Sequence, residues 1–150
     1  MQKVSFGKDG DFITAPHISK IFSEMILIWI ISAWKNIYIN KKINIVELGA
    51  GNGEMMHQII NTSKRFFDFH KKCKFIIYEK SPKLINVQKE KLKNEKIKWV
   101  KNLDQLESNP TIFLGNEFLD ALPIKQYVKR KKIWYEKYVE KSGGKYSFTY

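Results

Sequence analysis

Cysteine is almost absent from this 150-residue chain, and histidine is scarce. The single thiol, Cys73, has no second cysteine with which to form an internal disulfide bond. Three histidines scattered along the sequence do not complete the ligand set of a zinc site, so we expect no metal centre. Because Cys73 stands just before an apolar run, we predict a packed strand residue and not a nucleophile. A reducing compartment fits this cysteine usage.

Arginine is scarce as well. It occurs only at Arg65 and Arg130, although the formal net charge is +12, so nearly all of the positive charge is lysine. Arginine is the residue that forks onto phosphates and guanine edges, and its scarcity argues against a dedicated nucleic-acid surface. Lysine is over-used together with isoleucine and asparagine, as an AT-rich genome would produce. We therefore interpret the charge as a solvated lysine surface.

No apolar run in the sequence is long enough for a membrane span. The most apolar segment, 25–34, has about half of the roughly twenty residues that a spanning helix needs, so we predict a core helix there. The first eleven residues lead into acidic and glycine residues in place of a signal-peptide core. A hydrophobic content of 43% in 150 residues is typical of one folded domain with one core.

Short apolar runs alternate with helical patterns along most of the chain. Buried strands are predicted at 43–48, 73–78, 97–100 and 111–114. Strands alternating with helices at this spacing predict an α/β fold, a Rossmann-like parallel sheet flanked by helices and joined by right-handed crossovers. Past Pro123 the pattern changes to alternating apolar and polar residues with short turns, which predicts antiparallel hairpin strands.

Three helices are predicted between the strands. The first follows an irregular segment at 6–16 and runs from a cap at Thr14 to about Tyr38, and it is apolar enough to be buried on more than one face. The second begins near Gly53, and the third begins at Ser81 and Pro82 and continues to about Asn94. The inward side of the second helix is expected to carry Met56, Ile59, Ile60, Phe66 and Phe67.

We divide the chain into three parts: an N-terminal loop and helix at 1–42, a cofactor-binding core at 43–123 and a β-hairpin region at 124–150.

Three glycines at alternate positions follow the first strand. Glu47, Gly49, Gly51 and Gly53 form an acidic-x-Gly-x-Gly-x-Gly pattern, which lets backbone approach a ligand without Cβ atoms in the way. The spacing is too close for the dinucleotide pattern G-x-G-x-x-G, and no Lys-Ser/Thr follows as in a P-loop. What remains is typical of a site for a nucleoside without a phosphate, such as S-adenosylmethionine. The alternative is a bare tight turn in another α/β protein.

Two more polar groups follow predicted strands and are expected at the same sheet edge. Glu79 follows the second strand, where a carboxylate can accept both hydroxyls of a ribose. After the third strand, Asn102 or Asp104 could meet an adenine edge and Leu103 its face. The alternatives are a solvated surface glutamate and an ordinary polar loop.

A cluster of amide and carboxylate groups follows the fourth strand at 115–123. Asn116, Glu117 and Asp120 would lie where a transferable methyl group is presented. Methyl transfer is an in-line displacement that chiefly requires a positioned nucleophile. A carboxylate can orient an amine or a guanidinium and help to remove its proton, so we predict these three residues to be catalytic. A loop of capping and turn residues is the alternative.

Four segments, read in order, resemble one known family. They are Thr14-Ala-Pro-His-Ile-Ser19, Glu47-Leu-Gly-Ala-Gly-Asn-Gly53, Tyr78-Glu-Lys-Ser-Pro-Lys-Leu84 and Asn116-Glu-Phe-Leu-Asp-Ala-Leu-Pro123. The chain resembles the MidA-like family of class I S-adenosylmethionine-dependent methyltransferases, which includes a mitochondrial complex I assembly factor. The glycine motif alone would imply only the superfamily. The first and last segments are the more specific.

The resemblance implies S-adenosylmethionine as the methyl donor and a protein arginine as the acceptor, in a partner such as a respiratory complex I subunit. It carries Gly49, Gly51, Gly53 and Glu79 over to the cofactor, and it implies the cytoplasm of a bacterium or the mitochondrial matrix of a eukaryote. Ala50 and His17 depart from the family pattern, which commonly has proline and an acidic residue there. We expect His17 to be a helix-start residue and not a catalytic base.

Family members are longer than this chain, so we expect a fragment truncated at both ends, with a second polypeptide able to supply a C-terminal half. Binding is then a firmer expectation than turnover. Three alternatives stay open: a non-catalytic remnant that keeps the fold, an RNA methyltransferase favoured only by the charge, and another nucleoside-binding α/β enzyme such as a dehydrogenase, disfavoured by the glycine spacing.

Overall fold

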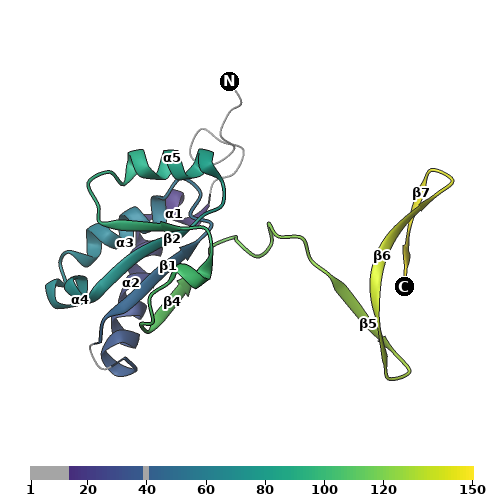
Figure 1. Ribbon diagram of the computed structural model, residues 1–150, viewed down its shortest axis with the longest axis horizontal. Coiled ribbons are helices and arrows are strands. Elements are labelled where there is room, and N and C mark those ends of the chain that lie inside the picture. The colour runs from purple at the N-terminus through teal and green to yellow at the C-terminus, as the bar shows by residue number, and fades with distance from the viewer. Residues whose placement is uncertain (1–13, 39–40) are drawn as a thin grey trace. The chain divides into compact units, whose positions relative to one another are not determined.

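The computed structural model describes residues 14–38 and 41–150 (Figure 1). The chain divides into two compact units, one ending at Phe118 and the other spanning Leu119–Tyr150. The irregular segment predicted before Thr14 lies outside the described residues, as does Asn40 at the predicted break before the first strand. None of the described helices is long and apolar enough to cross a membrane.

The first unit is built on a four-stranded parallel sheet. Its strands are β1 (Ile43–Leu48), β2 (Cys73–Tyr78), β3 (Ile97–Val100) and β4 (Thr111–Leu114), in the order β3-β2-β1-β4. All three pairings are parallel, and Ile45 of the central strand lies between Phe75 and Ile112. The strand positions and the parallel sheet predicted from the sequence are therefore confirmed.

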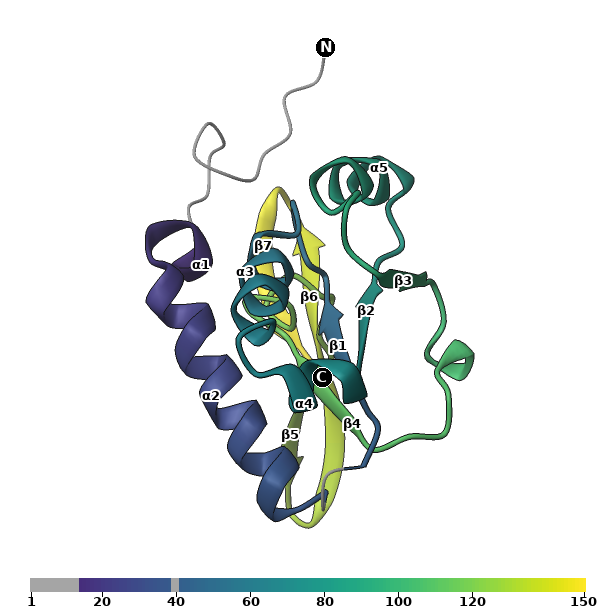
Figure 2. The ribbon, with the colours of Figure 1, turned by 90° about the vertical axis from the view of Figure 1, so that its left-hand side faces the viewer.

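Helices cover one face of this sheet (Figure 2). They are α1 (Ala15–Ile18), α2 (Lys20–Asn36), α3 (Glu54–Ser63), α4 (Phe67–Lys72) and α5 (Pro82–Lys91). The core on this face joins Leu27, Ile30 and Trp34 of α2, Met56 and Ile59 of α3, Phe69 of α4 and Leu92 after α5 to Ile43, Ile45 and Ile77 of the sheet. The opposite face carries a smaller cluster of Val46, Ile76 and Val100, against which Leu106 packs after the 3-10 helix η1 (Leu103–Gln105).

The predicted first helix is in fact two helices. Ser19 adopts an extended conformation, with φ −148° and ψ 127°, and its hydroxyl accepts from the N–H of Ile21 at 3.2 Å. A serine oxygen that satisfies an otherwise unpaired N–H starts a new helix at this position. Thr14 does occupy the position before α1, but its side chain makes no capping bond. It bonds the ring of His17 instead.

The predicted inward side of the second helix is partly wrong. The helix stops at Ser63, whose hydroxyl donates back to the carbonyl of Ile60 at 2.7 Å, a bond that competes with continuing the helix. Chain direction then changes before α4. As a result Phe66 and Phe67 are exposed, and Phe69 fills the core position in their place.

The prediction that α2 is buried on more than one face is also wrong for the part of the chain that the structure describes. Its inner side packs on α3 and the sheet. The outer side, with Ile21, Met25, Ile28 and Trp29, is exposed. The reason is topological: β4 is the edge strand of the sheet, and no described element of the first unit covers this side.

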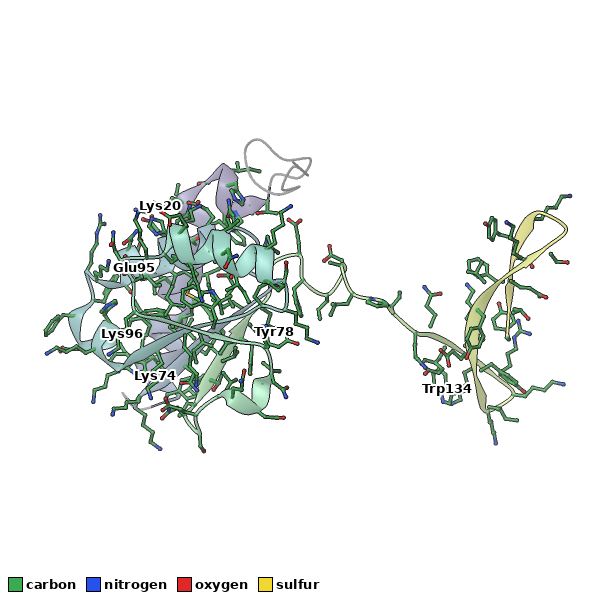
Figure 3. All side chains as sticks on the ribbon, turned by 45° about the horizontal axis from the view of Figure 1, so that its top comes forward. Lys20, Lys74, Tyr78, Glu95, Lys96 and Trp134 are labelled. Carbon is green, nitrogen blue, oxygen red and sulfur yellow. The ribbon has the colours of Figure 1, made fainter. Side chains whose placement is uncertain are left out.

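Lysines surround the first unit, and several are paired. Figure 3 labels Lys20 and Lys74, which form ion pairs with Glu24 and Glu107. Exposed pairs of this kind contribute about 0–1 kcal/mol each, so they fit the interpretation of a solvated charged surface.

The second unit is an antiparallel sheet of β5 (Gln126–Arg130), β6 (Ile133–Ser142) and β7 (Lys145–Thr149), in that order. Lys131 and Lys132, with φ of 46° and 74°, form the first turn, and Gly143 and Gly144 form the second. Two successive residues with positive φ match the twist of hairpin strands. The predicted antiparallel hairpin strands past Pro123 are thus confirmed.

Replacing Phe69 by alanine should destabilise the first unit far more than replacing Phe67. Phe69 is 2% exposed and meets the ring of Trp34 edge to face, whereas Phe67 is 62% exposed. A buried phenylalanine costs about 3–5 kcal/mol when truncated, and an exposed one about 0.5 kcal/mol. Urea unfolding followed by circular dichroism measures both variants. Equal losses would contradict the helix break at 64–66.

Candidate functional site

The glycine turn joins the carboxyl ends of β1 and β2. Gly49 donates its N–H to the carbonyl of Tyr78 at 3.0 Å, and its φ is +64°. A Cβ on Gly49 would lie 2.6 Å from Cδ2 of Phe118. Only glycine fits here, because both the backbone conformation and the aromatic ring exclude a side chain. The ring of Phe118 also stands edge to face with Tyr78, at a centroid distance of 6.4 Å.

Gly51 is open where Gly49 is closed. Its φ is +54°, and a Cβ added to it would meet no heavy atom within 4 Å. The space next to this backbone is therefore available to a ligand, and a side chain would occupy it. A cradle of this kind fits a nucleoside that lies against bare backbone.

Glu47 lies inside the first unit, at the end of β1. Its side chain is 4% exposed, and Oε2 has no hydrogen-bond partner among the described residues. Burial raises the pKa of this carboxyl to about 8, against a weaker lowering by a backbone hydrogen bond at Met56. The acid is thus protonated near neutral pH. It leaves one buried polar atom that a bound molecule could satisfy.

Glu79 is buried at the end of β2 and is held by its own loop. Oε1 accepts from the N–H groups of Lys80 and Ser81, both at 2.9 Å, and Oε2 accepts from Nε2 of Gln88 at 3.3 Å. A carboxylate offers about four acceptor positions. Three of them are taken by the chain, so Oε2 keeps the remaining capacity. This is a narrower arrangement than the free carboxylate expected from the sequence.

The polar side chains of the 116–120 segment are less closely gathered than its sequence suggests. Asn116 is half-buried after β4, Glu117 is exposed, and Asp120 is an exposed residue of the second unit. Glu117 has a φ of 50°. A non-glycine residue in this region carries strain of order 1–3 kcal/mol, which is most often found where a side chain must be aimed. The residue that the segment delivers to the glycine turn is Phe118.

Leu103 and Asp104 are exposed residues of η1, which follows β3. Asn102 caps this short helix, and Gln105 completes a reciprocal capping box with it. Oε1 of Gln105 accepts from the N–H groups of Lys101 and Asn102, so this side chain is committed to the backbone. Asn102, Leu103 and Asp104 are exposed residues of this loop that stay available to a ligand.

His17 reaches the glycine turn, which the sequence did not predict. Its Nε2 lies 3.0 Å from Oδ1 of Asn52, and Nδ1 lies 2.9 Å from the hydroxyl of Thr14. Gln58 of α3 donates to the carbonyl of Pro16 at 3.0 Å. The α1 segment is thus fastened to the turn and to α3. Nothing in the glycine motif indicates that Asn52 bonds to a histidine 35 residues earlier in the chain.

Gln88 is a second contact that went unrecognised. A glutamine in register with the apolar residues Leu84 and Leu92 of its helix is the signal that could have identified it. It bonds to Gly51 and to Glu79.

Cys73 behaves as predicted: burial raises the pKa of its thiol to about 12, and Sγ donates to the carbonyl of Phe69.

A groove of about 560 Å³ lies elsewhere on the first unit. It is lined by apolar side chains of α2, including Met25 and Trp29, together with Phe113 and Asn116 at the end of β4. None of the glycines 49–53, Glu47 or Glu79 lines it. The groove is therefore separate from the cradle and shares only the Asn116 region with the predicted site.

A parallel sheet with an open glycine turn and an acid on the next strand defines the class of nucleoside-binding α/β proteins. Residues 25–150 match the model of a family described as putative S-adenosyl-L-methionine-dependent methyltransferase. The chain belongs to this family, as the resemblance of its motifs implied.

Named relatives agree with this assignment. The chain is similar to the Caenorhabditis elegans homolog of the mitochondrial protein arginine methyltransferase NDUFAF7, with 36% identity over 92% of this chain and 36% of the relative. The Homo sapiens protein of that name is 30% identical over 89% of this chain and 36% of its own length. The chain thus spans little more than a third of these relatives.

A crystal structure from Burkholderia thailandensis shares the fold. It is described as a methyl transferase candidate bound to S-adenosyl-homocysteine, and it aligns with a TM-score of 0.72 at 23% identity, over 97% of this chain and 39% of that one. The Rossmann-like methyltransferase fold expected from the sequence is thereby confirmed.

The neutral carboxyl of Glu47 should give folding stability a specific pH dependence. Its pKa is about 8 in the folded chain, against 4.5 as the reference value. The contribution of protonated Glu47 to the free energy of unfolding is therefore complete below about pH 4.5. It is lost as the pH rises through about 8, at up to about 1.4 kcal/mol per pH unit. Glu47→Gln cannot ionise and should lack this loss.

Urea unfolding of both proteins at about pH 5.5 and about pH 8.5 measures the difference. Other titrating groups, such as His70, cancel in the comparison. A free energy difference between the two proteins that does not change with pH would contradict the protonated state of Glu47.

Proposed function

We propose that this chain binds S-adenosylmethionine at the glycine turn and forms the cofactor-binding part of a protein methyltransferase. The observation that carries this proposal is the pairing of an open backbone at Gly51 with the buried carboxylate of Glu79 at the same end of the sheet. Membership of a family described as S-adenosyl-L-methionine-dependent supports it.

In this proposal each residue has a separate task. Gly51 lets the cofactor lie against bare backbone, and Gly49 and Gly53 supply the positive φ angles that shape the turn. Glu79 accepts a ribose hydroxyl through Oε2. Glu47 offers its buried carboxyl to the cofactor side of the turn, and Leu103 and Asp104 take the adenine face and edge. Bound there, the cofactor supplies an activated methyl group.

We place the acceptor on the side of Asn116, Glu117 and Asp120. A guanidinium carries five N–H donors, and these amide and carboxylate groups can orient it and accept a proton as the methyl group arrives. The names of the relatives support a protein arginine as the acceptor. A respiratory complex I subunit, met in the mitochondrial matrix of a eukaryote or the cytoplasm of a bacterium, is the partner that we propose.

The relatives are far longer than the part that this chain matches. We propose that turnover requires the remaining part of the domain, which a second polypeptide could supply. A non-catalytic cofactor-binding protein is the second candidate, and the exposure of Glu117 and Asp120 favours it.

The cofactor site is tested by titrating S-adenosyl-homocysteine into the full chain in a calorimeter. Saturable binding is expected. Glu79→Gln should weaken it about 10- to 100-fold, the scale of a hydrogen bond to a charged group. Glu90→Gln is the matched control, because Glu90 is an exposed residue of α5 that forms an ion pair with exposed Lys93. Folded protein that binds nothing would overturn the proposed cofactor.

Turnover is tested with radiolabelled S-adenosylmethionine and an arginine-containing peptide, with and without a polypeptide covering the remainder of the relatives. Glu117→Gln should slow transfer about 100-fold or more, if this carboxylate takes the proton. Glu140→Gln, an exposed change on β6, should not. Binding without transfer in either mixture would favour the non-catalytic candidate. Methylation of RNA instead, with strongly salt-dependent binding, would overturn the protein substrate.

A further inference from the structure

Gln88 is the buried side chain of α5, with an exposed fraction of 0%. A primary amide in such a position costs free energy unless its hydrogen-bonding groups are satisfied. Its three contacts satisfy it: Nε2 lies 2.9 Å from the carbonyl of Gly51 and 3.3 Å from Oε2 of Glu79, and Oε1 lies 3.0 Å from Nε1 of Trp99.

The orientation of this amide follows from chemistry. An indole N–H can only donate, so the oxygen of Gln88 must face Trp99. The NH₂ group must then face the carbonyl of Gly51 and the carboxylate of Glu79, both of which only accept. Trp99 on β3 thus fixes which end of the amide points to the glycine turn.

These bonds tie together the ends of three strands. Gly51 follows β1, Glu79 follows β2, and Trp99 belongs to β3. In a trans peptide the C=O and N–H groups point in opposite directions. Holding the carbonyl of Gly51 toward Gln88 therefore also sets the direction of the Asn52 N–H, at the place where the turn is open. The same side chain holds Oε2 of Glu79.

We infer that Gln88 is a positioning residue of the cofactor site, which sets the Gly51–Asn52 peptide and the Glu79 carboxylate in their ligand-binding geometry. This inference rests on the proposed function. Gln88 touches the two groups assigned to the ligand without being exposed to the ligand itself. Trp99 acts in turn through Gln88.

Gln88→Met tests the inference, because methionine keeps the length of the side chain and removes both donors. Binding of S-adenosyl-homocysteine should weaken about tenfold or more, the scale of lost bonds that include a charged acceptor. Phe69→Ala is the control for lost stability: it lowers the free energy of unfolding at a site away from the turn, and it should leave the affinity unchanged. If Phe69→Ala weakens binding as much as Gln88→Met, the positioning role is overturned.

A double-mutant cycle separates positioning from general loosening. If Gln88 acts partly through Glu79, Gln88→Met should cost at least about threefold less affinity in the Glu79→Gln background than in the wild type. Equal costs in both backgrounds would overturn the link to Glu79. Trp99→Phe is a milder second variant that leaves Gln88 in place. It should weaken binding in the same direction, and unchanged binding would count against the fixed amide.

A measurement without ligand keeps this inference distinct from the proposed function. Amide-nitrogen relaxation of the free chain should give Gly51 and Asn52 order parameters near the rigid value of about 0.85, falling toward about 0.6 in Gln88→Met. Wild-type protein that binds no S-adenosyl-homocysteine would overturn the proposed function, and the relaxation data would then decide whether Gln88 holds the turn. Unchanged order parameters in Gln88→Met would overturn that hold.

Discussion

The position of β1 at the centre of the sheet is the constraint on which the rest of the first unit depends. It pairs with β2 on one edge and with β4 on the other, and Ile43, Ile45 and Val46 are fully buried. Side chains of this strand therefore enter both clusters of the core. The strand also ends at Leu48, directly before Gly49. A firm central strand gives the turn a fixed starting point, which a backbone cradle requires.

The site is assembled from elements that each contribute little alone. The glycine turn provides open backbone, β2 provides one carboxylate, and α5 provides the amide that joins them. From the other side, His17 and Phe118 contact the turn from segments before β1 and after β4. A buried polar network of this kind is costly when partly satisfied and rigid when complete. Apart from this network, the buried carboxyl of Glu47 keeps Oε2 without a hydrogen-bond partner among the described residues.

Sequence patterns predicted the sheet well and the side-chain contacts poorly, for physical reasons. Strands such as 73–78 are runs of apolar residues that are hard to place elsewhere. Helix breaks at Ser19 and Ser63 depend on where a hydroxyl finds a partner, which periodicity does not report. The prediction for Phe66 and Phe67 extended the periodicity of α3 beyond Ser63, where the helix ends. The role of the Gln88 amide could not be predicted from the sequence, because its partners Gly51 and Trp99 are neighbours in space and not along the chain.

The strand order also says something about how the first unit folds. Ile45 pairs with Phe75 on one side and with the more distant Ile112 on the other. Closing a longer loop costs more chain entropy, although each doubling adds only about 0.6 kcal/mol. Pairing of β1 with β2 thus loses less chain entropy than pairing of β1 with β4. It already brings Gly51 and Glu79 to one edge of the sheet. Phe118 follows β4 in the chain and contacts Gly49, so we expect this contact to form after β1 and β2 have paired.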